Sequence, residues 1–426
     1  MTSSFSRRAV AAALLSTGLA LGAVSPALAT PTSATASVDT AVRFATFNAS
    51  LNRGAEGELV RDLSTGTNAQ AAAVAEIIQR SAPDVLLINE FDYVAGGQAA
   101  ELFRDNYLAV SHHGSTPVDY PYYYVAPVNT GVPSGKDLDN NGSVGGPGDA
   151  YGFGLFPGQY GMVVYSKYPI ATEQIRTFQN FLWKDMPGAL LPDDPATPIP
   201  ADYYSPDELD VFRLSSKSHW DLPIRIGTGA SATTVHFLVS HPTPPVFDGP
   251  EKRNATRNHD EIRLWADYIS GGTTASYLYD DNGVRGGLAP GERFVIAGDQ
   301  NADPYDGDSM DNAIHQLLDH PRINTSVTPE SQGGVAAAAQ GGSNDSHVGP
   351  DAQDTADFND APGTSGNLRA DYVLPSRQLP ILDAGIFWPT PDEEFSYLTD
   401  PTGNGWPAIS SDHRLVWVDV HLNNKN

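Results

Sequence analysis

The sequence of 426 residues contains no cysteine, so disulfide bonds contribute nothing to its stability. A chain of this kind depends on the size of its core, on bound metal or on rigid loops. Basic residues are scarce as well: 25 Lys and Arg stand against 51 Asp and Glu, and the formal net charge is −26. Because binding to DNA phosphates requires clustered Lys and Arg, this balance argues against general affinity for polyanions and for anionic membranes. It still allows a small local pocket that takes a phosphate ester.

Long apolar runs are also lacking. The stretch of residues 9–24 is apolar, but it is too short and too rich in alanine to be a good transmembrane span. Two arginines precede it, and Ala27-Leu28-Ala29 follows it as a small-residue cleavage motif. We therefore predict a signal peptide over residues 1–29, followed by a linker over residues 30–40 that is rich in Ser, Thr, Ala and Pro. The expected location is extracellular, after export by the Sec or the twin-arginine route.

Short apolar segments of strand length recur along the rest of the chain. Helical periodicity appears between some of them, over residues 68–80 and 258–270, and Asn258 followed by Glu261 suggests a capping box at the start of the second helix. Many strands with few helices indicate two sheets packed face to face, with the helices outside. Three Gly-, Pro- or Asp-rich stretches look like insertions into this pattern, at residues 120–149, 186–208 and 331–367.

Several of the apolar segments run into a polar residue. Strand ends that share one edge of a sheet can meet in space, and their loops then build one site. The polar residues at these strand ends are Asn48, Glu90, His241, Asp299 and Asp371. Carboxylates and carboxamides suit hard cations such as Mg²⁺, and imidazole suits proton transfer, so the set fits the hydrolysis of a phosphate ester.

Two segments carry the clearest chemical pattern. Gly298-Asp299-Gln300-Asn301 follows an apolar run, and its glycine allows the backbone to turn at the strand end. Asp299 and Asn301 are two residues apart, so in an extended chain they face the same side. Ser411-Asp412-His413 precedes the last apolar strand and offers one metal ligand and one imidazole. Each segment taken alone is also compatible with an ordinary polar turn.

Three further segments occur in order with these two: Phe-Ala-Thr-Phe-Asn at 44–48, Pro-Asp-Val-Leu-Leu-Ile-Asn-Glu at 83–90, and Leu-Arg-Ala-Asp-Tyr-Val-Leu-Pro-Ser at 368–376. The whole set resembles the endonuclease/exonuclease/phosphatase superfamily, which includes DNase I-like nucleases, neutral sphingomyelinases, inositol polyphosphate phosphatases and secreted bacterial phosphoesterases. The resemblance implies an α/β fold, a four-layer α/β/β/α sandwich with two mixed sheets face to face and outer helices. It covers nearly all of one catalytic domain, residues 41–426.

The resemblance also implies how the matched residues bind metal and water. Glu90 is expected to be the main ligand of Mg²⁺ or Mn²⁺, helped by Asn48 and Asp412. Asp299 is expected to orient or deprotonate the attacking water. Asn301 is expected to hold a phosphoryl oxygen.

Two histidines complete the roles that the resemblance implies. His413 is expected to donate a hydrogen bond to the phosphate in the transition state, and Asp371 to fix the tautomer of that imidazole. His241, in Val-Ser-His-Pro-Thr-Pro, stands where many members of the superfamily have a second catalytic histidine.

The basic segment around Lys217 and His219 has two interpretations. Positive side chains are rare in this acidic chain, so either residue could bind substrate phosphate, and the alternative is a surface β-segment. No Arg/Lys tract of the kind that grips DNA is visible in the sequence. Phe91-Asp92-Tyr93 follows Glu90, where nucleases of the superfamily often have a basic residue nearby.

A calcium-loop pattern, Asp137-x-Asp139-x-Asn141-Gly, lies in the first insertion. The bidentate glutamate of an EF-hand is missing at the twelfth position, where Gly148 stands with Asp149 beside it. A full EF-hand is therefore not expected. A single loop clipped by Ca²⁺ and a solvated turn both remain open.

The sequence thus predicts a secreted, divalent-metal-dependent phosphoesterase that hydrolyses phosphate mono- or diesters by in-line attack of water. The expected partner is a small phosphate ester or a phospholipid headgroup, nucleic acid is disfavoured, and a monomer is expected. Two alternatives stay open, a secreted Mg²⁺-dependent endonuclease and a catalytically silent binding domain of the same fold. The presence of the full set of metal and catalytic residues argues against the silent domain.

Overall fold

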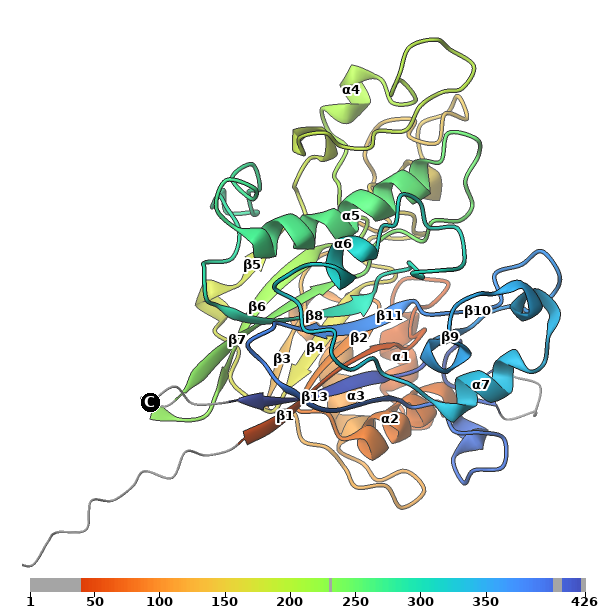
Figure 1. Cartoon of the computed structure of the whole chain (residues 1–426). Coiled ribbons are helices and arrows are strands. Elements are labelled where there is room, and N and C mark those ends of the chain that lie inside the picture. The colour runs from red at the N-terminus through yellow and green to blue at the C-terminus, as the bar shows by residue number, and fades with distance from the viewer. Residues whose placement is uncertain (1–39, 230–231, 401–407, 423–426) are drawn as a thin grey trace, which may run out of the picture. The chain divides into compact units, whose positions relative to one another are not determined.

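Two β-sheets form the centre of the protein in the computed structural model, which describes residues 40–229, 232–400 and 408–422 (Figure 1). These residues belong to one unit, Val38–Asn426. The predicted signal peptide, and the predicted linker up to residue 39, lie outside the described residues. Within the described ranges, the helices are all too short or too polar to cross a membrane.

The first sheet consists of β1 (Thr40–Asn48), β2 (Val85–Asn89), β3 (Tyr122–Tyr124), β4 (Met162–Ser166), β12 (Ile381–Ile386) and β13 (Val416–Leu422). Their order is β12-β13-β1-β2-β4-β3, with β1 and β2 parallel and the other neighbours antiparallel. Every residue of β2 is buried, as its uninterrupted apolar sequence predicts for a strand that is covered on both faces.

The second sheet consists of β5 (Arg176–Thr177), β6 (His219–Ile226), β7 (Thr233–Ser240), β8 (Arg293–Asp299) and β11 (Asp371–Pro375). Their order is β11-β8-β7-β6-β5, and β7 and β8 are the parallel pair. A separate two-stranded ladder joins β9 (Ala356–Asp357) to β10 (Asn367–Leu368).

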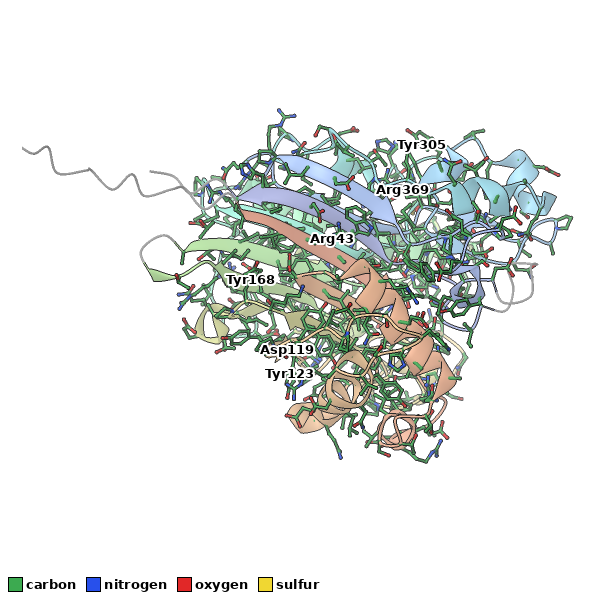
Figure 2. All side chains as sticks on the ribbon, turned by 90° about the horizontal axis from the view of Figure 1, so that it is seen from below. Arg43, Asp119, Tyr123, Tyr168, Tyr305 and Arg369 are labelled. Atoms are coloured by element: carbon green, nitrogen blue, oxygen red, sulfur yellow. The ribbon has the colours of Figure 1, made fainter. Side chains whose placement is uncertain are left out.

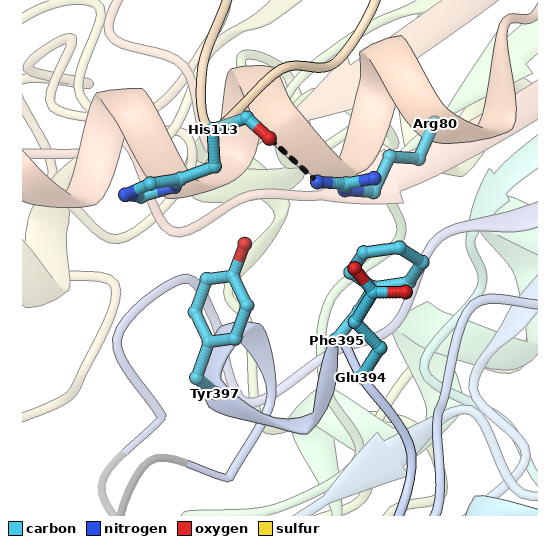
Figure 3. Close-up of a pocket in the computed structure, with 5 residues that line it drawn as sticks. All are labelled: Arg80, His113, Glu394, Phe395 and Tyr397. Carbon is cyan, nitrogen blue, oxygen red and sulfur yellow. Dashed lines mark hydrogen bonds between the residues drawn. The ribbon is translucent and has the colours of Figure 1, made fainter.

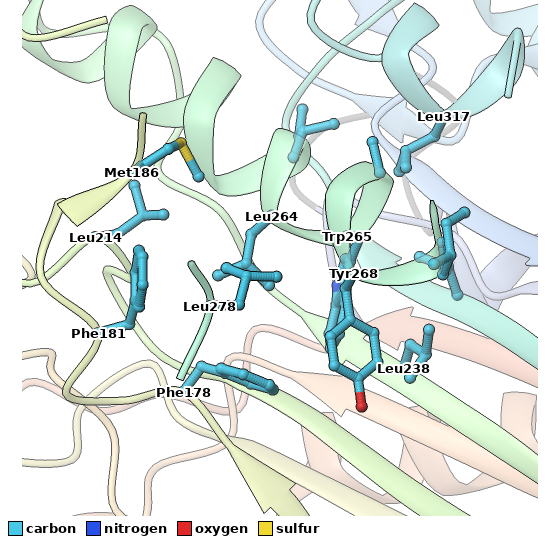
Figure 4. Packing of buried hydrophobic residues seen from close by; sticks show 14 of the residues in the cluster. Phe178, Phe181, Met186, Leu214, Leu238, Leu264, Trp265, Tyr268, Leu278 and Leu317 are labelled. Carbon is cyan, nitrogen blue, oxygen red and sulfur yellow. The ribbon is translucent and has the colours of Figure 1, made fainter. Parts of the chain in front are cut away.

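The two sheets face each other across an apolar core. Phe44 of β1 and Phe237 of β7 are fully buried in it, with ring centroids 5.5 Å apart. Helices α1 (Glu58–Leu63), α2 (Ala69–Ser81) and α3 (Gln98–Phe103) pack on the other face of the first sheet. Helix α5 (Arg253–Ser270) covers the second sheet with Trp265 and Tyr268 (Figure 4). The predicted four-layer α/β/β/α sandwich is therefore confirmed. Shorter helices lie in the connections: α4 (Pro206–Leu209), α6 (His315–Leu318) and α7 (Gln332–Ala338).

The start of α5 differs from the sequence prediction. The helix begins at Arg253, five residues before the expected N-cap at Asn258, and the predicted capping box is wrong. Lys252 precedes the helix in a left-handed conformation, and the carboxylate of Asp248 accepts the backbone N–H groups of Asn254 and Ala255. A side chain from the preceding loop therefore caps the first turn, so Asn258 is free to point inward.

The predicted insertions are partly built into the sheets and the loops at their polar edge. Strand β3 of the first insertion joins the edge of the first sheet, and the third insertion contains α7 and β9.

Tyr305 and Arg369, labelled in Figure 2, lie on the loops after β8 and before β11. Both donate a backbone N–H to the carboxylate of Asp303, at 2.7 and 2.8 Å, which joins the two loops.

We predict that Phe237→Ala lowers the free energy of unfolding by about 3–5 kcal/mol, because it opens a cavity between the sheets that neighbouring side chains cannot fill. Urea denaturation measures the change. Leu155→Ala is the control, since Leu155 is 58% exposed, and such a surface change is expected to cost no more than about 0.5 kcal/mol. Equal losses in the two variants would show that the sheets do not depend on this contact.

Candidate active site

The predicted site residues meet at one edge of the two sheets. Asn48 and Asn89 end neighbouring parallel strands of the first sheet and pair in register. Asp299 ends β8 in the second sheet and pairs with Asp371, the first residue of the antiparallel strand β11. Strand β7 is parallel to β8 and runs into His241. Strand pairing therefore gathers the polar strand ends within each sheet, and the hydrogen bond from Asn48 to Asp299 joins the two groups.

The carboxylate of Asp299 is the centre of this group. Its Oδ2 accepts a hydrogen bond from Asn48 Nδ2 at 3.0 Å, and lies 3.4 Å from Nε2 of His241 and 3.7 Å from Nε2 of His413. Asp299 is 1% exposed. Burial opposes its ionisation, but the two imidazoles and Asn48 outweigh burial and hold the pKa of Asp299 well below its usual range. Asp299 is thus an ionised carboxylate between two imidazoles.

The imidazole of His413 is bonded on its far side to Asp371, with 2.8 Å between Nδ1 and the carboxylate Oδ2. Thr355 Oγ1 donates to the same oxygen at 2.8 Å and accepts the backbone N–H groups of Ala370 and Asp371. Burial favours a neutral ring, yet Asp371 and Asp299 raise the pKa of His413 well above its usual value. His413 is therefore an imidazolium whose orientation is set by Asp371.

Asp299, Asp371 and His413 also present ligand atoms within 4.8 Å of one another. A metal ion at this point would have to displace the proton that joins His413 to Asp371. The 2.8 Å hydrogen bond and the raised pKa of His413 favour a proton between these two side chains.

Asn301 does not continue the strand, so the expectation of an extended chain through Asp299 and Asn301 is wrong. Strand β8 ends at Asp299, and Asn301 has a φ of 51°, in the left-handed region. Its backbone N–H donates to Asp299 Oδ1 at 2.8 Å, and its side-chain Nδ2 donates to the carbonyl oxygen of Pro242 at 3.1 Å. Asn301 thereby joins the loop after β8 to the loop after β7.

Oxygen atoms suited to a hard cation lie on the side of the first sheet. Glu90 Oε2 accepts a hydrogen bond from Asn52 Nδ2 at 2.8 Å, and Asp412 Oδ1 accepts one from Ser50 Oγ at 3.2 Å. The backbone N–H of Ser50 also donates to Asn48 Oδ1 at 3.3 Å. In the part of the chain that the structure describes, the hydrogen-bond partners of both carboxylates are neutral side chains. Two carboxylates with neutral hydrogen-bond partners and one carboxamide are oxygen ligands of the kind that a divalent cation such as Mg²⁺ or Mn²⁺ prefers.

Lys217 and His219 have different surroundings. Lys217 is 6% exposed, and among the described residues its ammonium has no hydrogen-bond or ion-pair partner. Burial lowers the pKa of Lys217 against the opposing charges of Glu261, Glu90 and Asp299, so the ammonium lies near the acidic side of the site. His219 is packed inside, with Nδ1 bonded to a serine hydroxyl at 2.7 Å and Nε2 to the carbonyl oxygen of Glu261 at 2.9 Å. Burial lowers the pKa of His219 to about 4. The ammonium of Lys217 therefore remains available to a ligand, whereas both ring nitrogens of His219 are already hydrogen-bonded.

The predicted calcium loop brings three carboxylates together. Ligand oxygens of Asp137, Asp139 and Asp149 lie within 4.8 Å of one another. Asp149, next to the twelfth loop position, is buried and accepts the backbone N–H of Leu138 at 2.8 Å. The side-chain oxygen of Asn141, the third residue of the predicted loop, accepts the backbone N–H of Ser143 at 2.9 Å.

Three polar residues that support the site were not found from the sequence. Asn52 donates a hydrogen bond to Glu90, Thr355 donates one to Asp371, and Asn89 accepts the backbone N–H of Asp299 at 3.1 Å. Asn89 stands beside Glu90 at the end of a predicted strand, which was a usable signal. Asn52 and Thr355 lie in loops, where the sequence gives no pattern that separates them from solvated polar residues.

A surface cavity of about 400 Å³ lies elsewhere, lined by Arg80, His113, Glu394, Phe395 and Tyr397 (Figure 3). None of the predicted site residues lines it. Buried Glu76 accepts hydrogen bonds from Arg80, His113 and Tyr397 there, and the Arg80 guanidinium stacks on the Phe395 ring at 3.6 Å. The charge of Arg80 is thus already paired, and the cluster fastens the segment around residue 395 to α2.

Comparison with known proteins shows the family. The model of the endonuclease/exonuclease/phosphatase family matches residues 45–413. Among solved structures, an endonuclease/exonuclease/phosphatase from Beutenbergia cavernae is 15% identical, with a TM-score of 0.45 over 90% of this chain and 72% of the other. Sphingomyelinase C from Streptomyces griseocarneus is 14% identical, with a TM-score of 0.41 over 89% and 99%. A mannosyl-6-phosphatase from Bacteroides thetaiotaomicron is 10% identical, with a TM-score of 0.40 over 89% and 99%. No curated protein matches the sequence.

We predict that Asp371→Asn lowers the pKa of His413, because it removes the carboxylate charge that outweighs burial of the ring. Titration of the histidine rings by NMR in metal-free protein measures this. In the wild type the ring of His413 should remain protonated well above the reference pKa of about 6.5, and in the variant it should lose its proton at lower pH. His236, whose pKa is raised by Asp221 against burial, is the control and should not change. A wild-type His413 that titrates near the reference value would contradict the assignment.

Proposed function

The chain belongs to the endonuclease/exonuclease/phosphatase family, and on that basis we propose that it hydrolyses phosphate mono- or diesters with the help of a divalent metal. The observation that supports this most directly is the Asp299 carboxylate, buried between His241 and His413 with Asp371 behind the second imidazole. An ionised carboxylate beside an imidazolium can align a water molecule and stabilise charge on a phosphoryl group in the same site.

In the proposed reaction, Asp299 accepts a hydrogen bond from the attacking water and aligns it with the phosphorus atom. The lowered pKa makes Asp299 a weak base, so its main contribution is orientation and it accepts the proton late. His413 donates from Nε2 to a phosphoryl oxygen as negative charge grows there, while Asp371 holds the ring. Lys217 and Asn301 would bind further phosphoryl oxygens from the second sheet's side.

The metal side of the proposed site consists of Glu90, Asn48 and Asp412. A bound Mg²⁺ or Mn²⁺ supplies charge neutralisation on the phosphoryl oxygens and on the leaving oxygen. Asn52 and Ser50 orient the carboxylates through neutral hydrogen bonds, so the negative charge remains available to a cation.

The proposed substrate is a small phosphate ester or a phospholipid headgroup. A nuclease needs several basic side chains along the path of the nucleic acid, and this chain has 25 basic residues against 51 acidic ones. The single ammonium of Lys217 can neutralise the charge of one phosphate group but not that of a polyanion. We also propose that the enzyme is secreted, because residues 1–29 have the composition of an export signal.

Asp299→Asn and His413→Gln are each expected to lower kcat by about 10²–10⁴, because each removes a group that acts on the water or on the developing charge. EDTA should abolish turnover, and Mg²⁺ or Mn²⁺ should restore it. The measurement is initial rates on a monoester, a diester, a phospholipid and plasmid DNA. Asp383→Asn, an exposed carboxylate on β12, is the control and should keep the wild-type rate.

Each outcome of these assays distinguishes the proposed function from one of its alternatives. Turnover that survives in both active-site variants, or that persists in EDTA, contradicts the proposed mechanism. Nicking of plasmid DNA faster than hydrolysis of the small esters favours the endonuclease. Absence of hydrolysis on every substrate favours the catalytically silent binding domain.

We further propose that Ca²⁺ binds the cluster of Asp137, Asp139 and Asp149, whose oxygens are the ligands that this ion prefers. Ca²⁺ at a hundred times its dissociation constant should stabilise the fold by about 2.7 kcal/mol, seen as a rise in Tm. Asp137→Asn combined with Asp139→Asn should remove the rise, and Glu90→Gln, at the other proposed cation site, should keep it. An equal rise in all the proteins would show that Ca²⁺ binds elsewhere.

A further inference from the structure

Glu261 of α5 holds the backbone next to two side chains of the proposed site. Its carboxylate is fully buried, and its Oε1 and Oε2 accept the backbone N–H groups of Ser216 and Thr243, each at 2.6 Å. Ser216 directly precedes Lys217, and Thr243 follows His241 by two residues. One carboxylate of an outer helix therefore fixes the segments that present Lys217 and His241.

The same side of α5 also holds the third loop of the site. Asn258, one turn before Glu261, donates from Nδ2 to the carbonyl oxygens of Thr243 at 2.8 Å and Gln300 at 2.9 Å. Ser216 Oγ donates to the carbonyl oxygen of His241 at 3.3 Å, which joins two of the loops directly. The loops after β7 and β8, and the segment before β6, are thus hydrogen-bonded to one turn of α5.

The charge of Glu261 acts together with this geometry. The ammonium of Lys217 is almost fully buried, and the carboxylates whose charge acts on it are Glu261, Glu90 and Asp299. In the proposed function Glu90 binds metal and Asp299 aligns water, so Glu261 is the one of the three that remains to balance the ammonium. A buried ammonium without a balancing charge is costly and tends to lose its proton.

We infer that Glu261 is a positioning residue, which keeps Lys217 charged and directed at the substrate phosphate while it fixes the loop of His241 against Asp299. This inference rests on the proposed function, and it identifies Glu261 as the residue that positions the phosphate-binding group of that site. A purely structural role is the competing explanation, because any acceptor would satisfy two buried backbone N–H groups. The two explanations differ in whether the loss of Glu261 acts through Lys217.

Glu261→Gln removes the charge and keeps one carbonyl oxygen as an acceptor. Its matched control is Asp260→Asn, since Asp260 is the preceding residue of α5, is equally buried, and accepts the backbone N–H of Leu190 and the Trp183 Nε1–H, each at 2.7 Å. Both variants remove one buried carboxylate that clamps a loop, but Asp260 holds the second insertion and not the site. Thermal unfolding of both variants shows that each is folded at the assay temperature.

The first measurement is the affinity of the Mg²⁺-loaded protein for inorganic phosphate, by calorimetry. Glu261→Gln should weaken binding about tenfold, and in the Lys217→Met background it should change binding by less than about twofold, because the inferred effect of Glu261 acts through Lys217 and coupled residues are not additive. Asp260→Asn should leave phosphate affinity unchanged in both backgrounds. The inference is overturned if the double variant loses phosphate affinity by the product of the factors lost in Glu261→Gln and in Lys217→Met. It is also overturned if Asp260→Asn loses as much affinity as Glu261→Gln.

Glu261→Asp is a second variant that keeps the charge and shortens the reach. Its phosphate affinity should lie nearer to the wild type than that of Glu261→Gln, and an equal or weaker affinity overturns the role of the charge. If the wild type hydrolyses no ester but binds phosphate, the proposed function fails, and the same affinities still decide on Glu261. If the wild type binds no phosphate, the inference about Glu261 is overturned.

Discussion

The hydrogen bond from Asn48 to Asp299 joins the two sheets at their polar edge, and the proposed site depends on it. The apolar core holds the sheets together but does not fix their relative position with the accuracy that a buried ionised carboxylate requires. Asp299 needs donors in place of water. Asn48 supplies one from the first sheet, and Asn89 fixes the neighbouring backbone by accepting the N–H of Asp299 and donating to the carbonyl oxygen of Ser240 at 3.4 Å. The same hydrogen bonds therefore join the two sheets and hold Asp299 in the proposed site.

Much of this arrangement could be predicted because the signal is local. A polar residue directly after an apolar run marks a strand end, and parallel neighbours place such ends together, as Asn48 and Asp299 show. The supporting residues could not be found in this way. Thr355 and Glu261 act through contacts with segments 16 and 45 residues away, and the sequence around them does not reveal those partners. The start of α5 was mispredicted for a different reason, because its cap comes from Asp248 in the preceding loop and not from a residue at the capping-box spacing.

The third insertion shows why loop-like sequence is a poor guide to what a segment does. Its Ala356 forms a β-bridge with His413, and the ring of Phe358 meets the His413 imidazole edge-on at 5.2 Å between centroids. Asp357 accepts a 2.8 Å hydrogen bond from Arg414, so a buried ion pair flanks His413. Its Gly-, Ala- and Asp-rich composition predicted only an insertion, whereas the structure shows that this part of it packs behind the site and contacts the His413–Asp371 pair.

The acidic surface and a phosphate site are compatible because charge acts over a limited range. At physiological salt the Debye length is about 8 Å, so most of the net charge of −26 is screened from a single phosphate inside the site. There the nearby charges decide, and the imidazolium of His413 and the ammonium of Lys217 face the carboxylates that would hold a divalent cation. A polyanion would extend well beyond that length over an acidic surface and would be repelled along it. The acidic balance of the chain thus supports the proposal of a small phosphate ester as substrate, because a long polyanion would meet more of the acidic chain than a single phosphate does.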